Sequence, residues 1–405
     1  MTIGVGGKSQ EEALSKLTNM VDNIQPIQET EYQQRLAKAQ DLMAHAGLQA
    51  IYLNAGTNLY YFTGTKWYAS ERMVGAILTN KGHLEYIVPQ FEIETFNGFS
   101  LTEGAIIAWE EHQCPYQFVS LRLKELGINE GRIGVDESTP YFISDGLKQN
   151  APFIDFVSAK SVTAGCRMCK SSAEINLLTK AKTMTLEVHK AAASILKPGI
   201  STHEVTEFIN LAHQKVGATG SSFCIVLFGE DTSYPHGVKN PKKLEVNDVV
   251  LIDTGCLVEG YNSDITRTYV FGKPTQRHRE FWAIEKQAQA KAFEKAQLGV
   301  ACGEVDVAAR SYIENQGLGP DYQVPGLPHR TGHGIGLDIH EWPYLVKSDS
   351  TPLAVGMCFS NEPMLVIPNE FGIRLEDHFY MTEKGPKWFT EPSYSIDDPF
   401  GLQVN

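Results

Sequence analysis

The sequence has no long hydrophobic run and no excess of basic residues. Nowhere do about 18 apolar residues follow one another, the length at which a helix can cross a bilayer, and the first residues lack the apolar stretch of a signal peptide. The 35 Lys and Arg residues are outnumbered by 48 Asp and Glu, which gives a formal net charge of −13. Because phosphate backbones and anionic lipids repel such a charge, we expect neither a nucleic acid nor a membrane as a partner.

Cysteine is scarce, with seven scattered residues, an odd number. This usage favours reduced thiols over a disulfide framework. Cys166 and Cys169 have CxxC spacing, but neither a second pair nor a strand–helix redox context accompanies them. Together with the missing export signal, the cysteine usage predicts a cytoplasmic protein.

The length and the texture of the chain predict two domains. A chain of 405 residues with 42% hydrophobic content exceeds what one core usually fills. Helix and strand signals alternate up to about residue 157, beginning with a helix expected over 9–23 and including an aromatic loop or short strand at 58–62. A long helix expected over 171–196 then precedes a strand-rich region that contains many His, Asp and Glu residues. We therefore expect an α/β (α+β) protein with an N-terminal domain at 1–165 and a second domain at 166–405, which contains the candidate functional residues.

Two aspartates occur in a predicted hairpin of the second domain. A short β-branched run at 249–252, turn residues at 259–260 and a second β-rich run are typical of two paired strands. If the turn is centred between residues 258 and 259, Asp253 and Asp264 lie directly opposite each other. Two carboxylates held that close repel unless a proton or a cation lies between them.

Four further ligand-type residues follow the aspartate pair, namely His333, Glu362, Glu376 and Asp377. Glu362 and Glu376, like Asp253, lie in buried-strand patterns. If these three acids and Asp264 are buried together, they carry about four negative charges, which two divalent cations would neutralise. One imidazole with four carboxylates suits Mn²⁺, Co²⁺ or Zn²⁺. Arg374 lies two residues before Glu376, on the same strand face, where it would orient an acidic ligand.

The motifs that contain these residues resemble those of one protein family. IDTG, YNSDITRT, GHGIGLDIHEWP, NEP and RLED occur in this order between about residues 165 and 390. The series is similar to that of the prolidase, aminopeptidase P and creatinase family, whose catalytic domain has a pita-bread fold. The resemblance implies that Asp264 and Glu376 bridge two metal ions, of which Mn²⁺ is favoured. It also implies that Asp253 binds one ion and that His333 and Glu362 bind the other.

The resemblance further implies a reaction and a substrate. A hydroxide that bridges the two ions would attack the bond before proline in short peptides, with Glu362 as proton shuttle. His236, His329 and His340 match the family's histidines that contact the substrate or its tetrahedral intermediate. Tyr344 stands where some archaeal-type prolidases place an arginine for the dipeptide carboxylate, so both dipeptides and longer Xaa-Pro peptides stay open as substrates.

The same resemblance suggests a homodimer. The aromatic-rich segment 57–68 could cover the site of a neighbouring copy, or it could belong to the core of the N-terminal domain.

Other activities occur on the same fold. A creatinase-type C–N hydrolase would lack the full ligand set, and a dimethylsulfoniopropionate lyase would have a further aspartate where this chain has Gly255. A metal-free binding module is the third alternative, and the five intact ligand positions argue against it. We therefore expect Xaa-Pro hydrolysis, closest to that of a dipeptidase.

Overall fold

The computed structural model describes residues 1–403, which form two compact units. One unit consists of residues 27–167, and the other combines residues 1–26 with the chain from 168 onward. The second unit therefore includes the first 26 residues, which we had expected in the N-terminal domain. The Thr2 hydroxyl donates to the carbonyl of Val270 at 2.7 Å, and the Thr2 N–H donates to that of Gly272 at 3.0 Å. No local sequence signal predicts hydrogen bonds between residues so far apart.

The unit of residues 27–167 contains a six-stranded sheet with the strand order β4-β3-β2-β1-β5-β6. Strand β2 pairs antiparallel with β1 and β3, whereas the remaining neighbours pair in parallel. The elements of this unit are α2 (Glu29–Ala46), β1 (Ala50–Asn54), α3 (Thr57–Thr63), β2 (Gly75–Thr79), β3 (Leu84–Pro89), η1 (Gln90–Glu92), α4 (Ile93–Phe99), β4 (Ala105–Trp109), α5 (Pro115–Glu125), β5 (Gly131–Val135), α6 (Tyr141–Asn150), β6 (Ile154–Ser158) and α7 (Lys160–Arg167).

The aromatic segment 58–62 forms helix α3, so the expected loop or short strand was wrong. Leu59 and Phe62, three positions apart, are fully buried, so packing outweighs the β-propensity of the aromatic residues. Tyr61 and Phe62 belong to the core of the unit, whereas Tyr60 is half-buried and Tyr68 is 94% exposed.

The larger unit contains five α-helices, one short 3-10 helix and twelve strands among its described residues. Its elements are α1 (Gln10–Ser15), α8 (Ser172–Ser194), α9 (Thr202–Lys215), β7 (Phe223–Phe228), η2 (Gly229–Ser233), β8 (Val249–Gly255), β9 (Leu257–Val258), β10 (Tyr261–Asn262), β11 (Ile265–Val270), α10 (Gln276–Lys295), α11 (Cys302–Asn315), β12 (Gly332–Gly334), β13 (Glu341–Leu345), β14 (Cys358–Asn361), β15 (Met364–Ile367), β16 (Phe371–Arg374), β17 (Asp377–Thr382) and β18 (Gly385–Trp388). Helix α1 begins at the predicted capping box but ends at Ser15, not near residue 23. The Asn19 side chain accepts the N–H of Val21 at 3.0 Å, a local turn that competes with helix.

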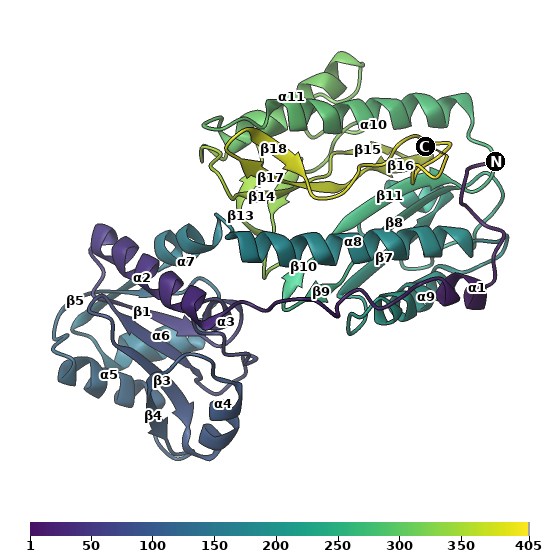
Figure 1. The fold of residues 1–405 in the computed structure, drawn as a ribbon. Helices are drawn as coiled ribbons and strands as arrows, with labels where there is room; N and C mark the ends of the chain where they lie inside the picture. Colours follow the sequence, from purple (N-terminus) through teal and green to yellow (C-terminus); the bar gives the residue numbers. More distant parts are fainter. Residues whose placement is uncertain (404–405) are drawn as a thin grey trace. The chain divides into compact units, whose positions relative to one another are not determined.

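Helices enclose the strands of this unit. Strands β11-β8-β7 form one sheet and β13-β12-β14-β17-β18 another, with two-stranded pairs β10-β9 and β15-β16 beside them. Helix α8 lies on one side of the strands, and α10 runs beside α11 on the other (Figure 1). The core between them consists of apolar side chains such as Leu251, Ala288, Phe359 and Leu375. Among the described residues, no helix is both long and apolar enough to cross a membrane.

The predicted hairpin exists, but its register differs from the expected one by two residues. Asp253 of β8 pairs with Thr266 of β11, so Asp264 is its diagonal neighbour and not its direct partner. The turn residues Glu259 and Gly260 both have positive φ, 49° and 83°, as a two-residue type I′ turn requires. The turn is therefore centred one position later than the sequence pattern suggested, which moves every pair by two.

Candidate metal centre

Five separate segments of the larger unit bring ligand-type side chains together. Each lies in or directly beside a strand, where backbone hydrogen bonds fix its position. The N–H of Glu362 donates to the carbonyl of Thr331 at 2.8 Å, and that of Glu376 donates to Thr266 at 3.1 Å. The five side chains are Asp253 at the end of β8, Asp264 before β11, His333 in β12, Glu362 after β14 and Glu376 before β17.

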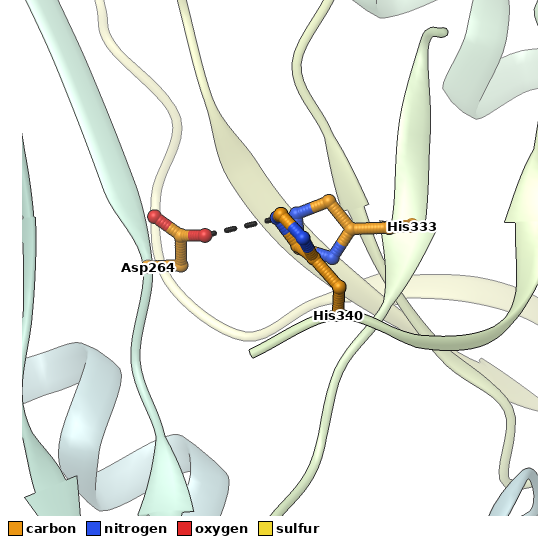
Figure 2. A group of neighbouring side chains, drawn as sticks. All are labelled: Asp264, His333 and His340. Carbon is orange, nitrogen blue, oxygen red and sulfur yellow. Dashed lines mark ion pairs between the residues drawn. The ribbon is translucent and has the colours of Figure 1, made fainter. Parts of the chain in front are cut away.

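His333 lies among the carboxylates. Its Nε2 is 3.1 Å from Glu362 Oε1. The same nitrogen is 3.7 Å from Asp264 Oδ2, the pair that is drawn in Figure 2. Its Nδ1 is 2.9 Å from the carbonyl of Gly334, so Nδ1 donates there and Nε2 retains its lone pair for a ligand. The side chain is 1% exposed. This arrangement of the two ring nitrogens is typical of a metal-binding histidine.

The side chains of Arg374 and Thr266 form hydrogen bonds with two of the carboxylates. Arg374 donates from Nη2 to Asp253 at 2.5 Å and from Nε to the Thr266 hydroxyl at 3.0 Å. The same hydroxyl donates to Glu376 Oε2 at 2.8 Å. Arg374 therefore contacts Asp253 directly and reaches Glu376 through Thr266.

Burial works against the negative charge of this cluster. It raises the pKa of Asp264 and of Glu376 well above their ordinary values, and the neighbouring carboxylates add to the effect. Burial also raises the pKa of Asp253, although the Arg374 guanidinium opposes that shift. Burial acts on Glu362 in the same direction, but a protonated His333, whose Nε2 carries a proton in place of a metal ion, outweighs burial and lowers the pKa of Glu362 through its hydrogen bond and charge.

The cluster fits divalent cations on its own chemistry. Asp253 Oδ1 and Glu376 Oε1 are buried without a hydrogen-bond partner among the described residues. Such atoms are rare, because an unpaired buried carboxylate oxygen loses its hydration without compensation. Asp264, His333, Glu362 and Glu376 also belong to groups whose donor atoms all lie within 4.8 Å of one another. A cation would satisfy the unpaired oxygens and neutralise the charge.

The other predicted site residues surround this cluster to different degrees. The His340 ring lies 4.1 Å from that of His333, centre to centre, and the two rings overlap beside Asp264 in Figure 2. His340 and His236 are exposed, whereas His329 is half-buried and donates through Nδ1 to a backbone carbonyl at 2.7 Å. Desolvation of its ring and the nearby charge of His333 lower the pKa of His340 to about 4. Tyr344 pairs with His333 across β13 and β12.

The sequence reasoning missed His378 in β17. This side chain is fully buried, and its Nε2 is 3.8 Å from Glu376 Oε1. Burial lowers the pKa of His378 well below its ordinary value, so the ring is neutral. The signal was available, since His378 follows Glu376 by two positions in an extended segment and shares its face.

Two regions of the chain match known families. Residues 176–383 match metallopeptidase family M24, and residues 35–169 match the Creatinase/Prolidase N-terminal domain. The chain therefore belongs to metallopeptidase family M24, and its larger unit has the pita-bread fold that the motifs predicted.

Individual relatives support this assignment. An Xaa-Pro dipeptidase of Pyrococcus furiosus is 32% identical over 361 residues, covering 88% of this chain and 98% of that protein. The crystal structure of dipeptidase PepE from Mycobacterium ulcerans superposes with a TM-score of 0.84 at 32% identity, covering 91% of this chain and 97% of that one. A dipeptidase from Pyrococcus horikoshii gives a TM-score of 0.81 at 28% identity, covering 89% and 99%.

Proposed function

We propose that this protein is a metal-dependent hydrolase of Xaa-Pro peptide bonds. The observation that carries the proposal is the convergence of four carboxylates and His333 from five segments, with two carboxylate oxygens left unpartnered. The relatives named Xaa-Pro dipeptidase supply the substrate class.

Five side chains would hold two divalent ions. Asp264 and Glu376 would bridge them, Asp253 would bind one, and His333 with Glu362 the other. When bound, the ions would lower the pKa of a water molecule and polarise the peptide carbonyl. The oxygen-rich ligand set favours Mn²⁺, with Co²⁺ or Zn²⁺ as alternatives.

Glu362 is suited to move the proton. Its side chain is 14% exposed, more than those of Asp264 at 7% and Glu376 at 1%, so it lies nearest to solvent and substrate. Its Oε1 lies 3.1 Å from His333 Nε2, at the edge of the cluster, where the carboxylate can accept a proton from the attacking water. When the Xaa-Pro bond breaks, the proline nitrogen is the leaving group, and it carries no N–H in the peptide, so Glu362 would return this proton to it.

The exposed histidines would bind the peptide. His236 and His340 retain solvent contact, and a neutral His340 can donate to or accept from a peptide group at neutral pH. His329 is oriented by its bond to the Arg330 carbonyl. Tyr344, whose ring lies 4.5 Å from the Arg330 guanidinium, would border the peptide's far end.

The structure argues against the lyase alternative. A Cβ atom at Gly255 would lie 1.9 Å from the carbonyl oxygen of Ser263, so this backbone has no room for the additional aspartate. The full set of five ligand-type residues likewise disfavours a creatinase-type reaction and a metal-free module.

A substrate panel tests the proposal. The metal-free protein would be supplied with Mn²⁺, Co²⁺ or Zn²⁺ and assayed on Xaa-Pro dipeptides, Xaa-Pro-Yaa tripeptides and the matching Xaa-Ala peptides. We expect Mn²⁺-dependent cleavage before proline and little cleavage of Xaa-Ala. If no metal ion supports cleavage of either the Xaa-Pro dipeptides or the Xaa-Pro-Yaa tripeptides, the proposed function is refuted. The ratio of the dipeptide to the tripeptide cleavage rate would define the length preference.

Two further expectations belong to this proposal. We propose that the protein is cytoplasmic and a homodimer, the latter on the basis of the family resemblance. Light scattering at micromolar concentration should give twice the mass of one chain, and a monomer would contradict the prediction.

A further inference from the structure

His378 faces the same cluster as the five predicted ligands. In an extended chain, alternate residues share a face, so Glu376 and His378 point one way and Asp377 the other. Asp377 accordingly binds Arg267 at 2.7 Å, away from the cluster. Asp264, Glu376 and His378 offer donor atoms that all lie within 4.8 Å of one another.

The His378 ring is buried without compensation. It is 0% exposed, and neither ring nitrogen has a hydrogen-bond partner among the described residues. A buried polar group without a partner is destabilising, so its presence needs an explanation. His189, another fully buried histidine, differs because its Nε2 is bonded to the carbonyl of Ile265 at 2.9 Å.

The spacing suits a shared ion better than a direct hydrogen bond. His378 Nε2 lies 3.8 Å from Glu376 Oε1, too far for a hydrogen bond. Two donors that each bind one ion at about 2.1 Å lie about 3.0–4.2 Å apart, depending on the angle between them. The distance from His333 Nε2 to Asp264 Oδ2, 3.7 Å, is nearly the same.

We propose that His378 Nε2 is a direct ligand of a divalent ion that Asp264 and Glu376 also bind, so that the centre has a second imidazole. The inference rests on the metal centre proposed above and adds a sixth ligand to it. An imidazole adds a donor without adding negative charge to a cluster that already has four carboxylates, and it satisfies the unpaired nitrogen.

X-ray absorption of the Co²⁺-loaded protein tests this ligand directly. The outer-shell scattering of imidazole rings counts the histidines bound per chain, independently of activity. The wild-type protein would be compared with His378→Leu, which removes the donor, and with His378→Gln, which retains polarity. His189→Leu is the control, because it alters an equally buried histidine whose Nε2 bonds to the backbone.

We expect both His378 variants to lose one imidazole per chain. Chelator competition should show the apparent dissociation constant of one ion rising at least about 10-fold, while His189→Leu leaves both readouts near wild type. If His378→Leu does not fold, as judged by circular dichroism of the metal-free protein, the comparison of wild type with His378→Gln decides.

Two results would overturn the inference, and they are distinct from failure of the proposed function. An unchanged imidazole count in the His378 variants excludes direct ligation, even if affinity falls through a displaced Glu376. Unchanged metal affinity excludes it as well. A wild-type protein that binds no divalent ion would instead refute the metal centre itself, and the sixth ligand with it.

Discussion

Single residues in this protein differ in function because of what surrounds them. Asp253, Asp264 and Glu376 are buried and Glu362 is partly exposed, yet only Glu362 has a lowered pKa, because a protonated His333 contacts it. Among residues 1–403, Asp264 has no cationic hydrogen-bond partner of the kind that Arg374 provides for Asp253. Its charge therefore depends most on a bound cation.

Asp264→Asn should abolish most metal-dependent turnover. The amide is nearly isosteric but donates less charge to both ions, so we expect a loss of kcat of at least about 100-fold, the upper end for changes around metal ligands. Metal analysis should show fewer than the wild-type number of ions.

Asp338→Asn is the matched control for this change. It removes one charge from the same motif as His333 but from a residue outside the ligand set. We expect near wild-type metal content. An Asp264→Asn protein that keeps both its metal and most of its Xaa-Pro hydrolysis would refute the bridging assignment.

His213 should make the folded protein sensitive to acid. Burial lowers the pKa of His213 to about 4, from about 6.5 in an unfolded chain. Between these values the unfolded state binds the proton and the folded state does not, so stability falls as the pH falls from 6.5 to 4. Over this whole pH range, the protonation of His213 lowers the free energy of unfolding by about 3 kcal/mol.

His213→Gln should remove this part of the pH dependence. Urea unfolding of the metal-free variant at pH 7 and pH 4.5 should show a smaller difference in free energy of unfolding than the wild type. His203→Gln, a change at an exposed position, serves as control. Equal pH dependence in wild type and His213→Gln would contradict the prediction.

At the scale of elements, buried ion pairs hold the strands that carry the site. Asp306 and Arg310 lie one turn apart on α11, with the closest oxygen and nitrogen 3.2 Å apart. Asp306 also accepts the N–H and the hydroxyl of Thr331, at 2.9 and 2.7 Å, directly before β12. Helix α11 thereby fixes the segment that positions His333.

Asp306→Asn should destabilise the protein strongly. Removal of one partner leaves the Arg310 charge buried and unpaired, which typically costs about 3–5 kcal/mol. Chemical denaturation would measure this difference. Glu294→Gln breaks an exposed pair with Lys291 and should change the free energy of unfolding by less than about 1 kcal/mol. If Asp306→Asn changes the free energy of unfolding as little as Glu294→Gln does, the buried ion pair does not stabilise the fold.

At the scale of the whole molecule, the larger unit is built around a concentration of like charge. The ligands come from five segments that span residues 253–376, so a bound ion would cross-link segments that lie far apart in the sequence of this unit. The charge repulsion that the ion relieves is present in the folded state and dispersed in the unfolded chain.

Metal removal should therefore lower the thermal stability. At a free Mn²⁺ concentration of about 100 times Kd, binding to the folded state adds about 2.7 kcal/mol. We expect a Tm that rises with Mn²⁺ concentration in the wild type and falls after chelation. The Asp264→Asn protein should show little Mn²⁺ dependence. A wild-type Tm that is the same with and without Mn²⁺ would contradict a folded-state metal site.

The sequence alone determined the two α/β units, the pita-bread family and the hairpin with Asp253 and Asp264, because hydrophobic periodicity, turn residues and motif spacing are local properties. Only the tertiary structure decided the hairpin register, since positive φ at both Glu259 and Gly260 places the turn. It also decided that residues 1–26 join the larger unit and that Arg374 contacts Asp253. The unpartnered His378 emerged only there, because burial and missing hydrogen-bond partners depend on packing between segments far apart in the chain.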